Sequence, residues 1–206
     1  MTEHELPYSA ELWRKALHLV ALVIPLGTVL LGRSVSIAIL VLITVAAIAA
    51  DVLRVRSTVF ADWLYGTLGF MMRPEERPPM GSTTVINGAT WVLISATLLT
   101  VLFPLQIAVA AFTSFMIADA AAAVVGKRFG KHKWRGTSRT LEGSMAFIVT
   151  GILVMLPFPA ISVLPAVAAV IPGAAAEIPS GPLNDNLRVP LVMAGVLALI
   201  QYLNAG

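Results

Sequence analysis

Residues 118–144 contain the side chains whose types and spacing are best suited to chemistry. They read ADAAAAVVGKRFGKHKWRGTSRTLEGS, with one carboxylate, Asp119, near the end of a long apolar segment. Two glycines and a cluster of basic residues follow within a few positions. Cations and glycine backbone N–H groups bind phosphate oxygens, whereas a carboxylate binds a metal ion or accepts a proton. This order therefore indicates chemistry on an anionic substrate at a membrane surface.

Asp119 lies six residues before the end of an apolar segment at residues 105–125. A lone carboxylate costs about 2.5 to 3.5 kcal/mol at the middle of a membrane, and less near the interface. Two interpretations explain it: a structural ion pair with a neighbouring helix, or a role in metal binding or proton abstraction. The four alanines that follow let a second helix or a lipid headgroup come close. Gly126, seven residues after Asp119, returns to the same helical face.

The glycine and lysine pattern at residues 126–131 superficially resembles a nucleotide-binding P-loop. It has three residues between its glycines and His132 after its lysine, whereas a P-loop has four and then Ser or Thr. The P-loop interpretation is therefore rejected, although glycine N–H groups and basic side chains still suit a phosphate. An ordinary basic cytoplasmic loop is the alternative. The candidate nucleotide-binding residues are Gly126, Lys127, Arg128, Gly130, Lys131, Lys133 and Arg139.

Two further carboxylates are candidate metal ligands beside Asp119. Glu142 lies in a Thr-Leu-Glu-Gly-Ser sequence where the chain re-enters the membrane, and metal-phosphate sites use such hydroxyl and acidic groups. Asp185 precedes the last apolar segment, where it either binds a metal or caps a helix. The predicted ligands of a divalent cation are thus Asp119, Glu142 and Asp185.

Three polar residues lie at the start of the first apolar segment. Arg14 and His18 have the spacing i, i+4 and share a helix face, with Lys15 beside them. His18 is a candidate general base because histidine titrates near neutral pH. From sequence alone, the Arg-Lys pair is better explained as an anchor at the membrane surface. Further along, Asp51 and Arg54 have the spacing i, i+3 and are expected to pair with each other.

The composition predicts an integral membrane protein. Hydrophobic residues make up 58% of the 206 residues, only 12% are charged, and the mean hydropathy is +0.87. Such a chain has too little polar surface to close a soluble globule of this size. The charged residues are confined to connecting loops, so the net charge of +3 does not indicate a nucleic-acid partner. Cysteine is absent, which excludes disulfides and thiolate metal sites.

Seven apolar segments predict an all-α protein with about seven transmembrane helices, in a single polytopic domain covering residues 1–206. Most segments approach the roughly 20 residues that cross a bilayer core. The fifth and sixth are short and are separated by two prolines, so they predict either two tilted spans or one broken unit. The segments cover roughly residues 16–32, 35–53, 85–103, 105–125, 143–157, 160–176 and 189–205.

The distribution of positive charge predicts the orientation of these helices. With seven spans, the N-terminus and the loops at residues 54–84, 126–142 and 177–188 share one side of the membrane. Of the 14 lysines and arginines, only Arg33 lies on the other side. The positive-inside rule makes the charged side cytoplasmic. We therefore expect a cytoplasmic N-terminus and a polar site at the cytoplasmic face, in the plasma or inner membrane if the protein is prokaryotic.

Five motifs occur in a distinctive order along the chain. They are RKALH at residues 14–18, GSTT at 81–84, ADAAAAVVGKRFGKHK at 118–133, TLEGS at 140–144 and NDNLRVPL at 184–191. This ordered set resembles the CTP-dependent lipid kinases, which include dolichol kinase, phytol kinase and the CTP-using diacylglycerol kinase of yeast. The resemblance covers nearly the whole chain. It implies transfer of the γ-phosphoryl group of CTP to the hydroxyl of a membrane lipid, with Mg²⁺ or another divalent cation.

The resemblance also assigns roles to residues. It makes Arg14, Lys15 and Asp119 functional and aligns the motif glycine with Gly126. The sequence departs from the family pattern at Ala118, where glycine is usual, and at Asn184, which replaces one residue of an acid pair. The predicted catalytic residues are Asp119, Arg14, Lys15 and His18, with His18 the rival of Asp119 as general base.

Two alternative functions stay open. Phosphatidate cytidylyltransferases have a similar Asp, glycine and basic-loop arrangement, but they convert CTP into a CDP-lipid and pyrophosphate. A small anion or lipid transporter belongs to another class and predicts polar residues on both membrane faces. The expected partners are the bilayer, CTP and a membrane lipid with a hydroxyl group, such as a polyprenol, a phytol-like alcohol or diacylglycerol, and no nucleic acid. The acceptor and the oligomeric state are left open.

Overall fold

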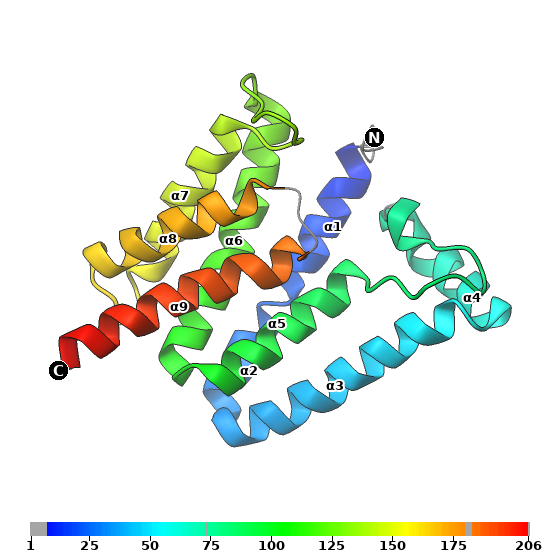
Figure 1. Cartoon of the computed structure of the whole chain (residues 1–206), viewed down its shortest axis with the longest axis horizontal. Helices are drawn as coiled ribbons and strands as arrows, with labels where there is room; N and C mark the ends of the chain where they lie inside the picture. The colour runs from blue at the N-terminus through cyan, green and yellow to red at the C-terminus, as the bar shows by residue number, and fades with distance from the viewer. Residues whose placement is uncertain (1–7, 73, 180–182, 206) are drawn as a thin grey trace.

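The computed structural model describes residues 8–72, 74–179 and 183–205. Within these ranges, every secondary-structure element of three residues or more is a helix (Figure 1). The all-α prediction is therefore confirmed. The α-helices are α1 (Tyr8–Val20), α2 (Val23–Leu31), α3 (Arg33–Arg54), α4 (Thr58–Leu68), α5 (Gly88–Leu102), α6 (Leu105–Phe129), α7 (Leu141–Met155), α8 (Val163–Glu177) and α9 (Asp185–Ala205). Two short 3₁₀ helices, η1 (Gly69–Met71) and η2 (Pro74–Glu76), connect α4 to α5.

All seven predicted apolar segments are helical, and the protein has the properties of an integral membrane protein. Within the described ranges, four stretches are long and apolar enough to cross a membrane: Trp13–Leu31, Arg33–Arg54, Leu105–Phe129 and Asp185–Asn204. The other three helices, α5, α7 and α8, are apolar but have 15 residues each. The fifth and sixth segments are thus two separate helices. The total of seven spans stays a prediction.

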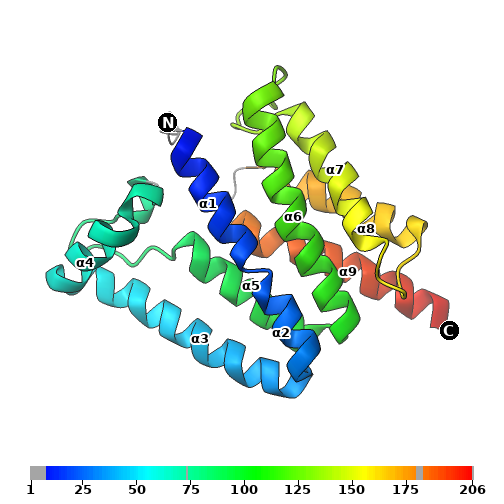
Figure 2. The same ribbon diagram turned by 180° about the vertical axis from the view of Figure 1, so that it is seen from behind.

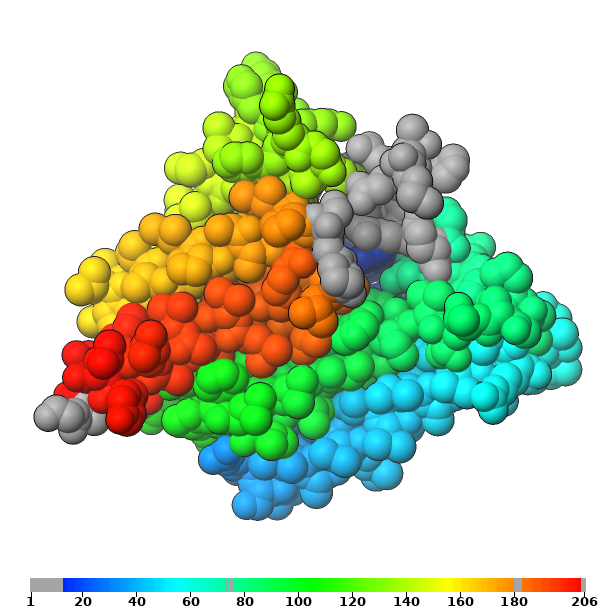
Figure 3. Space-filling view, in the orientation of Figure 1, coloured from blue at the N-terminus to red at the C-terminus, as the bar shows by residue number. Residues whose placement is uncertain are grey.

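Helix α6 lies at the centre of the bundle. It packs along α7 and also contacts α1, α2, α5 and α9 (Figure 2). Small residues such as Ala110 and Ala111 are fully buried on it, which allows the neighbouring helices to approach its backbone closely. Phe115 and Met116 complete the core on the same helix. One face of the molecule shows α8, α9, α5 and α3 side by side (Figure 3).

The outer helices present apolar side chains to their surroundings. Leu30 of α2 is 74% exposed and Leu42 of α3 is 71% exposed. Exposed apolar residues over two adjacent helices are expected where lipid replaces water as the solvent. The surface of α2 and α3 therefore fits contact with the acyl chains of a bilayer.

The first predicted span is broken between α1 and α2. Pro25 is the third residue of α2, and its ring nitrogen cannot donate the helical hydrogen bond to the carbonyl of Ala21. The chain instead forms shorter-range bonds, from the Ala21 N–H to the His18 carbonyl (3.1 Å) and from the Leu22 N–H to the Leu19 carbonyl (3.0 Å). Because of this break, α1 and α2 are two separate helices in place of one continuous helix.

Helix α4 was not predicted, since it falls within the loop expected at residues 54–84. Its N-terminus is capped by Ser57, whose side chain accepts a hydrogen bond from the Phe60 N–H (3.3 Å). Val59 is 80% exposed and Trp63 is 61% exposed on this helix. The prolines and charges that indicated a loop are concentrated after α4, at residues 73–79.

Arg54, at the end of α3, has no exposed surface. Its guanidinium lies 3.1 Å from Asp51 Oδ1, which confirms the predicted pair. It also donates hydrogen bonds to the backbone carbonyls of Glu76 and Val85, each at 2.6 Å. The other oxygen of Asp51 accepts from the Asn87 N–H (3.0 Å) at the start of α5. Arg54 and Asp51 therefore hold the connection between α4 and α5 against the end of α3.

The close contact of α7 with α6 and α8 generates a prediction for stability. A Cβ at Gly151 would lie 2.9 Å from Val170 Cγ1 and 3.3 Å from Ser114 Oγ, which itself donates to the Gly151 carbonyl (2.8 Å). Gly151→Ala should lower stability by about 1 to 3 kcal/mol through overpacking, seen as a lower Tm in detergent micelles. At Gly27 no atom lies within 4 Å of an added Cβ, so Gly27→Ala is the matched control. Equal melting of both variants would contradict the described packing.

Candidate functional site

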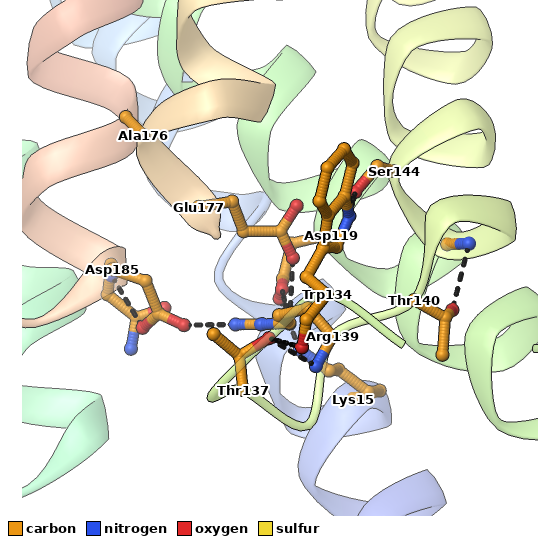
Figure 4. Close-up of polar contacts among 12 residues, drawn as sticks. Lys15, Asp119, Trp134, Thr137, Arg139, Thr140, Ser144, Ala176, Glu177 and Asp185 are labelled. Carbon is orange, nitrogen blue, oxygen red and sulfur yellow. Dashed lines mark hydrogen bonds and ion pairs between the residues drawn. The ribbon is translucent and has the colours of Figure 1, made fainter. Parts of the chain in front are cut away.

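A cluster of charged side chains from α1, α6, α8, α9 and the connection between α6 and α7 meets at one end of the bundle (Figure 4). Asp119, in the second half of α6, is its buried centre, with 4% of its side chain exposed. Lys15 of α1 donates a hydrogen bond and forms an ion pair with Asp119 Oδ2. The structure thus joins the N-terminal motif to the buried acid across 104 residues of sequence. An ion pair with a neighbouring helix, one of the two interpretations of Asp119, is present.

His18 lies one turn after Lys15 and faces the same carboxylate. Its Nε2 atom is 3.2 Å from Asp119 Oδ2, and its ring packs edge-on against Phe115 with centroids 5.6 Å apart. Only 9% of the His18 side chain is exposed, and Nε2 makes no hydrogen bond of good geometry. Nη1 of Arg14 is likewise buried without a partner. These two nitrogens are left without a hydrogen bond, as are Arg54 Nε, Tyr65 Oη and Ser95 Oγ elsewhere among the described residues.

Arg139 connects the acids of three helices. Its Nη1 atom lies 2.7 Å from Glu177 Oε1 at the end of α8 and 3.9 Å from Asp119 Oδ1. Its Nη2 atom donates a hydrogen bond to Asp185 Oδ2 at the start of α9. One guanidinium therefore contacts carboxylates that come from α6, α8 and α9.

The chain positions Arg139 with a small hairpin-like loop after α6. The Trp134 N–H donates to the Arg139 carbonyl (2.9 Å), and the Leu141 N–H donates to the His132 carbonyl (2.8 Å). Gly136 makes the turn with φ of 74°, which favours glycine. The Trp134 indole donates to Ser144 Oγ (3.1 Å) on α7, so the loop is fastened to the next helix.

Asp185 is free to contact Arg139 because its neighbour caps the helix. Asn184 Oδ1 accepts from the Asn186 N–H (3.0 Å), as a capping residue does at the start of a helix. One oxygen of Asp185 bonds the same N–H (2.9 Å), and the other bonds Arg139. Asp185 therefore shares the helix cap with Asn184 and pairs with Arg139, and its role as a metal ligand stays a prediction.

The predicted glycine turn after Asp119 is helical. Helix α6 continues through Gly126 to Phe129, and Gly130 follows it directly. A Cβ at Gly126 would lie 2.9 Å from Thr140 Oγ1, and one at Gly130 would lie 2.2 Å from the Gly126 carbonyl oxygen. These glycines therefore allow α6 to approach the start of α7. Their predicted role in binding a nucleotide stays a prediction.

The other predicted nucleotide-binding residues lie on the surface beyond the cluster. Arg128 places its guanidinium 5.6 Å from the centre of the Phe129 ring. These residues are exposed cations, which suit long-range attraction of a phosphate group. They are Lys127, Arg128, Lys131 and Lys133.

The predicted metal ligands are only partly brought together. Asp119 and Asp185 both contact Arg139, whereas Glu142 accepts hydrogen bonds from the ring (2.8 Å) and the N–H (3.3 Å) of His132. Among the described residues, no group of three or more His, Asp or Glu side chains has the arrangement of a ready metal site. Magnesium is usually bound by one or two carboxylates together with substrate phosphates, and Asp119 and Asp185 fit that pattern.

Glu177 belongs to the cluster but was not among the predicted site residues. Its side chain is 3% exposed, and its partner is Arg139. The signal for it was the same as for Asp119, a carboxylate at the end of an apolar helix on the charged side of the sequence. Glu177 and Arg139 are 38 residues apart, so their contact cannot be inferred from sequence spacing. It follows from the packing of α8 in the bundle with α6, α7 and α9.

Comparisons with known proteins agree with the resemblance seen in the motifs. Dolichol kinase of Saccharomyces cerevisiae is 52% identical over 40 residues, 19% of this chain and 8% of the kinase. A dolichol kinase of Schizosaccharomyces pombe is 34% identical over 86 residues, 36% of this chain and 16% of the kinase. The similarity to the lipid kinase family is therefore confirmed, over a small part of the kinases' own length.

A third relative matches over a longer range. An uncharacterized protein of Rickettsia prowazekii, RP860, is 25% identical over 143 residues, 69% of this chain and 68% of that protein. No family model matches the chain, and no solved structure matches it.

The buried pair of Lys15 and Asp119 generates a second stability prediction. Lys15→Met should lower stability by about 3 to 5 kcal/mol because it leaves a buried carboxylate without its bonded cation. Lys15→Met combined with Asp119→Asn should recover most of this loss, since the charge is removed along with its partner. Thermal unfolding in detergent, followed by tryptophan fluorescence, measures both variants. If Lys15→Met unfolds at the same temperature as the wild type, the pair does not stabilise the fold as described.

Proposed function

We propose that this protein is a CTP-dependent lipid kinase, which transfers the γ-phosphoryl group of CTP to the hydroxyl of a membrane lipid of the polyprenol type. The observation that carries the proposal is the meeting of Lys15, His18, Asp119 and Arg139 at one end of a membrane-type helix bundle. Similarity to two dolichol kinases supports the choice of acceptor. The donor CTP comes from the family resemblance of the motifs.

Phosphoryl transfer asks a protein mainly for alignment and for neutralisation of charge. Lys15 and Arg139 supply N–H donors at the centre of the cluster, and the unpartnered Nη1 of Arg14 supplies another. Such preorganised donors stabilise the charge that develops on transferring phosphate oxygens. A divalent cation, held by Asp119 and Asp185, would neutralise further phosphate charge when it is bound.

The proton of the lipid hydroxyl needs an acceptor, and the geometry favours His18 over Asp119. The Asp119 carboxylate already receives the Lys15 ammonium, which makes it a weak base. His18 Nε2 has no hydrogen-bond partner and lies 3.2 Å from Asp119 Oδ2. A proton taken up by His18 would thus be stabilised at once by the neighbouring carboxylate. In this proposal His18 is the general base and Asp119 supports it.

The lipid acceptor reaches these groups from the bilayer along α1. Leu17 and Val20 flank His18 on this helix and are 50% and 64% exposed. Apolar residues beside a buried histidine let a hydrocarbon chain stay in the membrane while its hydroxyl meets the polar cluster. A phytol-like alcohol or diacylglycerol would enter in the same way. We place the site at the cytoplasmic face, where the positive-inside rule puts the basic loops and where CTP is present.

The products formed from CTP distinguish this proposal from its rivals. Purified protein with CTP, Mg²⁺ and a polyprenol in detergent should release CDP and form a polyprenyl phosphate. A phosphatidate cytidylyltransferase would instead release pyrophosphate and form a CDP-lipid from phosphatidate. A transporter would form neither product, and failure to bind CTP in the presence of Mg²⁺ would reject both enzymes.

The two catalytic candidates should differ in their effect on the pH dependence of turnover. Asp119→Asn should lower kcat at least about a hundredfold because it removes electrostatic stabilisation. His18→Gln should lower kcat by a similar or larger factor and abolish the rise of rate with pH that a neutral imidazole base produces. Arg56→Gln, a substitution on the exposed surface outside the cluster, should turn over as the wild type does. An unchanged pH profile in His18→Gln would remove His18 from the role of base.

A further inference from the structure

Helix α4 carries apolar side chains on its outer face. Val59 is 80% exposed and Trp63 is 61% exposed, and their spacing of i, i+4 places them on one side of the helix. Thr67 follows Trp63 at the same spacing, and its hydroxyl donates to the backbone carbonyls of Trp63 (2.9 Å) and Leu64 (3.1 Å). Phe70, in η1, is 57% exposed. The outer face of α4 therefore offers apolar surface and a hydroxyl that is satisfied within the helix.

The opposite face of α4 is fixed against the protein. Ala61 is 4% exposed, and the guanidinium of Arg77 lies 5.9 Å from the centre of the Tyr65 ring. A Cβ at Gly69, directly after α4, would lie 3.2 Å from Arg77 Nη2, so the same guanidinium also packs against the end of the helix. Met71 of η1 is buried, and η1 contacts α1. These contacts fix the rotation of α4, so its apolar side is held facing outward.

The end of α3 sets the depth of α4 in the membrane. Helix α3 is one of the stretches long and apolar enough to cross a membrane, and α4 begins four residues after it ends. The Ser57 N–H donates to the Leu53 carbonyl (2.9 Å), so the chain turns at the end of α3 without moving away from it. Figure 1 shows α4 lying across that end. Helix α4 is therefore held at the level where α3 leaves the bilayer.

The tryptophans of the chain mark the same level. Besides the one in α4, they lie in α1 directly before Arg14, near the start of α5 and in the loop after α6, all toward the end of the bundle that holds the charged cluster. They are Trp13, Trp63, Trp91 and Trp134. Tryptophan is enriched at membrane–water interfaces because its ring is amphipathic. Arg56 before α4 and Arg77 after it are exposed cations, which suit the phosphate groups of lipids.

We propose that α4 is an interfacial helix, which lies in the surface of the bilayer at the charged end of the bundle. Val59, Trp63 and Phe70 enter the boundary between the lipid headgroups and the acyl chains, and the partner of this face is the lipid itself. An apolar face on a helix that cannot leave the membrane surface is the pattern of such helices. Because η1 contacts α1, this contact holds the start of α1 at the membrane surface. The placement does not rest on the kinase reaction.

Fluorophores on single cysteines test this placement, because the chain contains no cysteine of its own. Val59→Cys is labelled with nitrobenzoxadiazole, and the full-length protein is reconstituted into vesicles of phosphatidylcholine and phosphatidylglycerol. Lipids with a nitroxide near the headgroup should quench this probe at least about twofold more than a probe in water, since an interfacial helix buries its apolar face about 5 to 10 Å deep. Aqueous iodide should quench it less.

Two further cysteines calibrate the depth of the probe. Arg135→Cys, at an exposed position in the loop after α6, supplies the probe in water. Leu42→Cys, which replaces an exposed residue in the middle of α3, should respond most to a nitroxide deep in the acyl chain. Thr67→Cys, on the same side of α4 as Trp63, repeats the measurement if Val59→Cys does not fold, as judged by circular dichroism and gel filtration.

Two outcomes would overturn the interfacial placement. In the first, iodide quenches the probe at position 59 as strongly as the probe at position 135, so α4 lies in water. In the second, the probe at position 59 is shielded from iodide and from both nitroxides while Val59→Cys forms disulfide-linked dimers, so a second copy of the chain covers this face. Neither readout requires turnover, so the interfacial helix stands or fails separately from the kinase proposal.

Discussion

The buried carboxylate of Asp119 is the constraint on which the rest of the structure depends. A carboxylate that is only 4% exposed, within the central helix α6, must have its charge compensated, and Lys15 supplies the bonded cation. This single requirement brings α1 against α6 and sets His18 beside the acid. Arg139 then links the same centre to α8 and α9. The charged cluster and the helix packing are therefore one arrangement.

Much of this arrangement could be predicted from sequence because polar residues in an apolar chain are conspicuous. The seven apolar segments and the pair of Asp51 and Arg54 rest on patterns within a few residues. Lys15 and Asp119, which form an ion pair in the structure, stand out through the order of motifs along the chain. The role of Glu177 could not be predicted in this way. Its partner is fixed by helix packing, which a membrane chain encodes in small and interchangeable apolar residues.

Two local features show what simple patterns leave out. Pro25 divides the first apolar segment into α1 and α2, while the stretch Trp13–Leu31 as a whole is still long and apolar enough to cross a membrane. Gly126 looked like a turn after a buried acid, but it lies inside α6 and allows close contact with Thr140. In both cases the residue type was informative, and its consequence depended on neighbours that lie one helical turn away or on the next helix.

The full burial of Arg54 has a consequence for the order in which the chain matures. Its two terminal nitrogens donate to the carbonyls of Glu76 and Val85, which are synthesised more than twenty residues after it. A guanidinium cannot enter a dry interior before its acceptors exist. The end of α3 must therefore remain hydrated during translation until the segment before α5 has emerged. The packing around the end of α3 is thus completed only after synthesis of the third apolar segment, which forms α5, has begun. The first two spans are therefore not fully packed before the third is made.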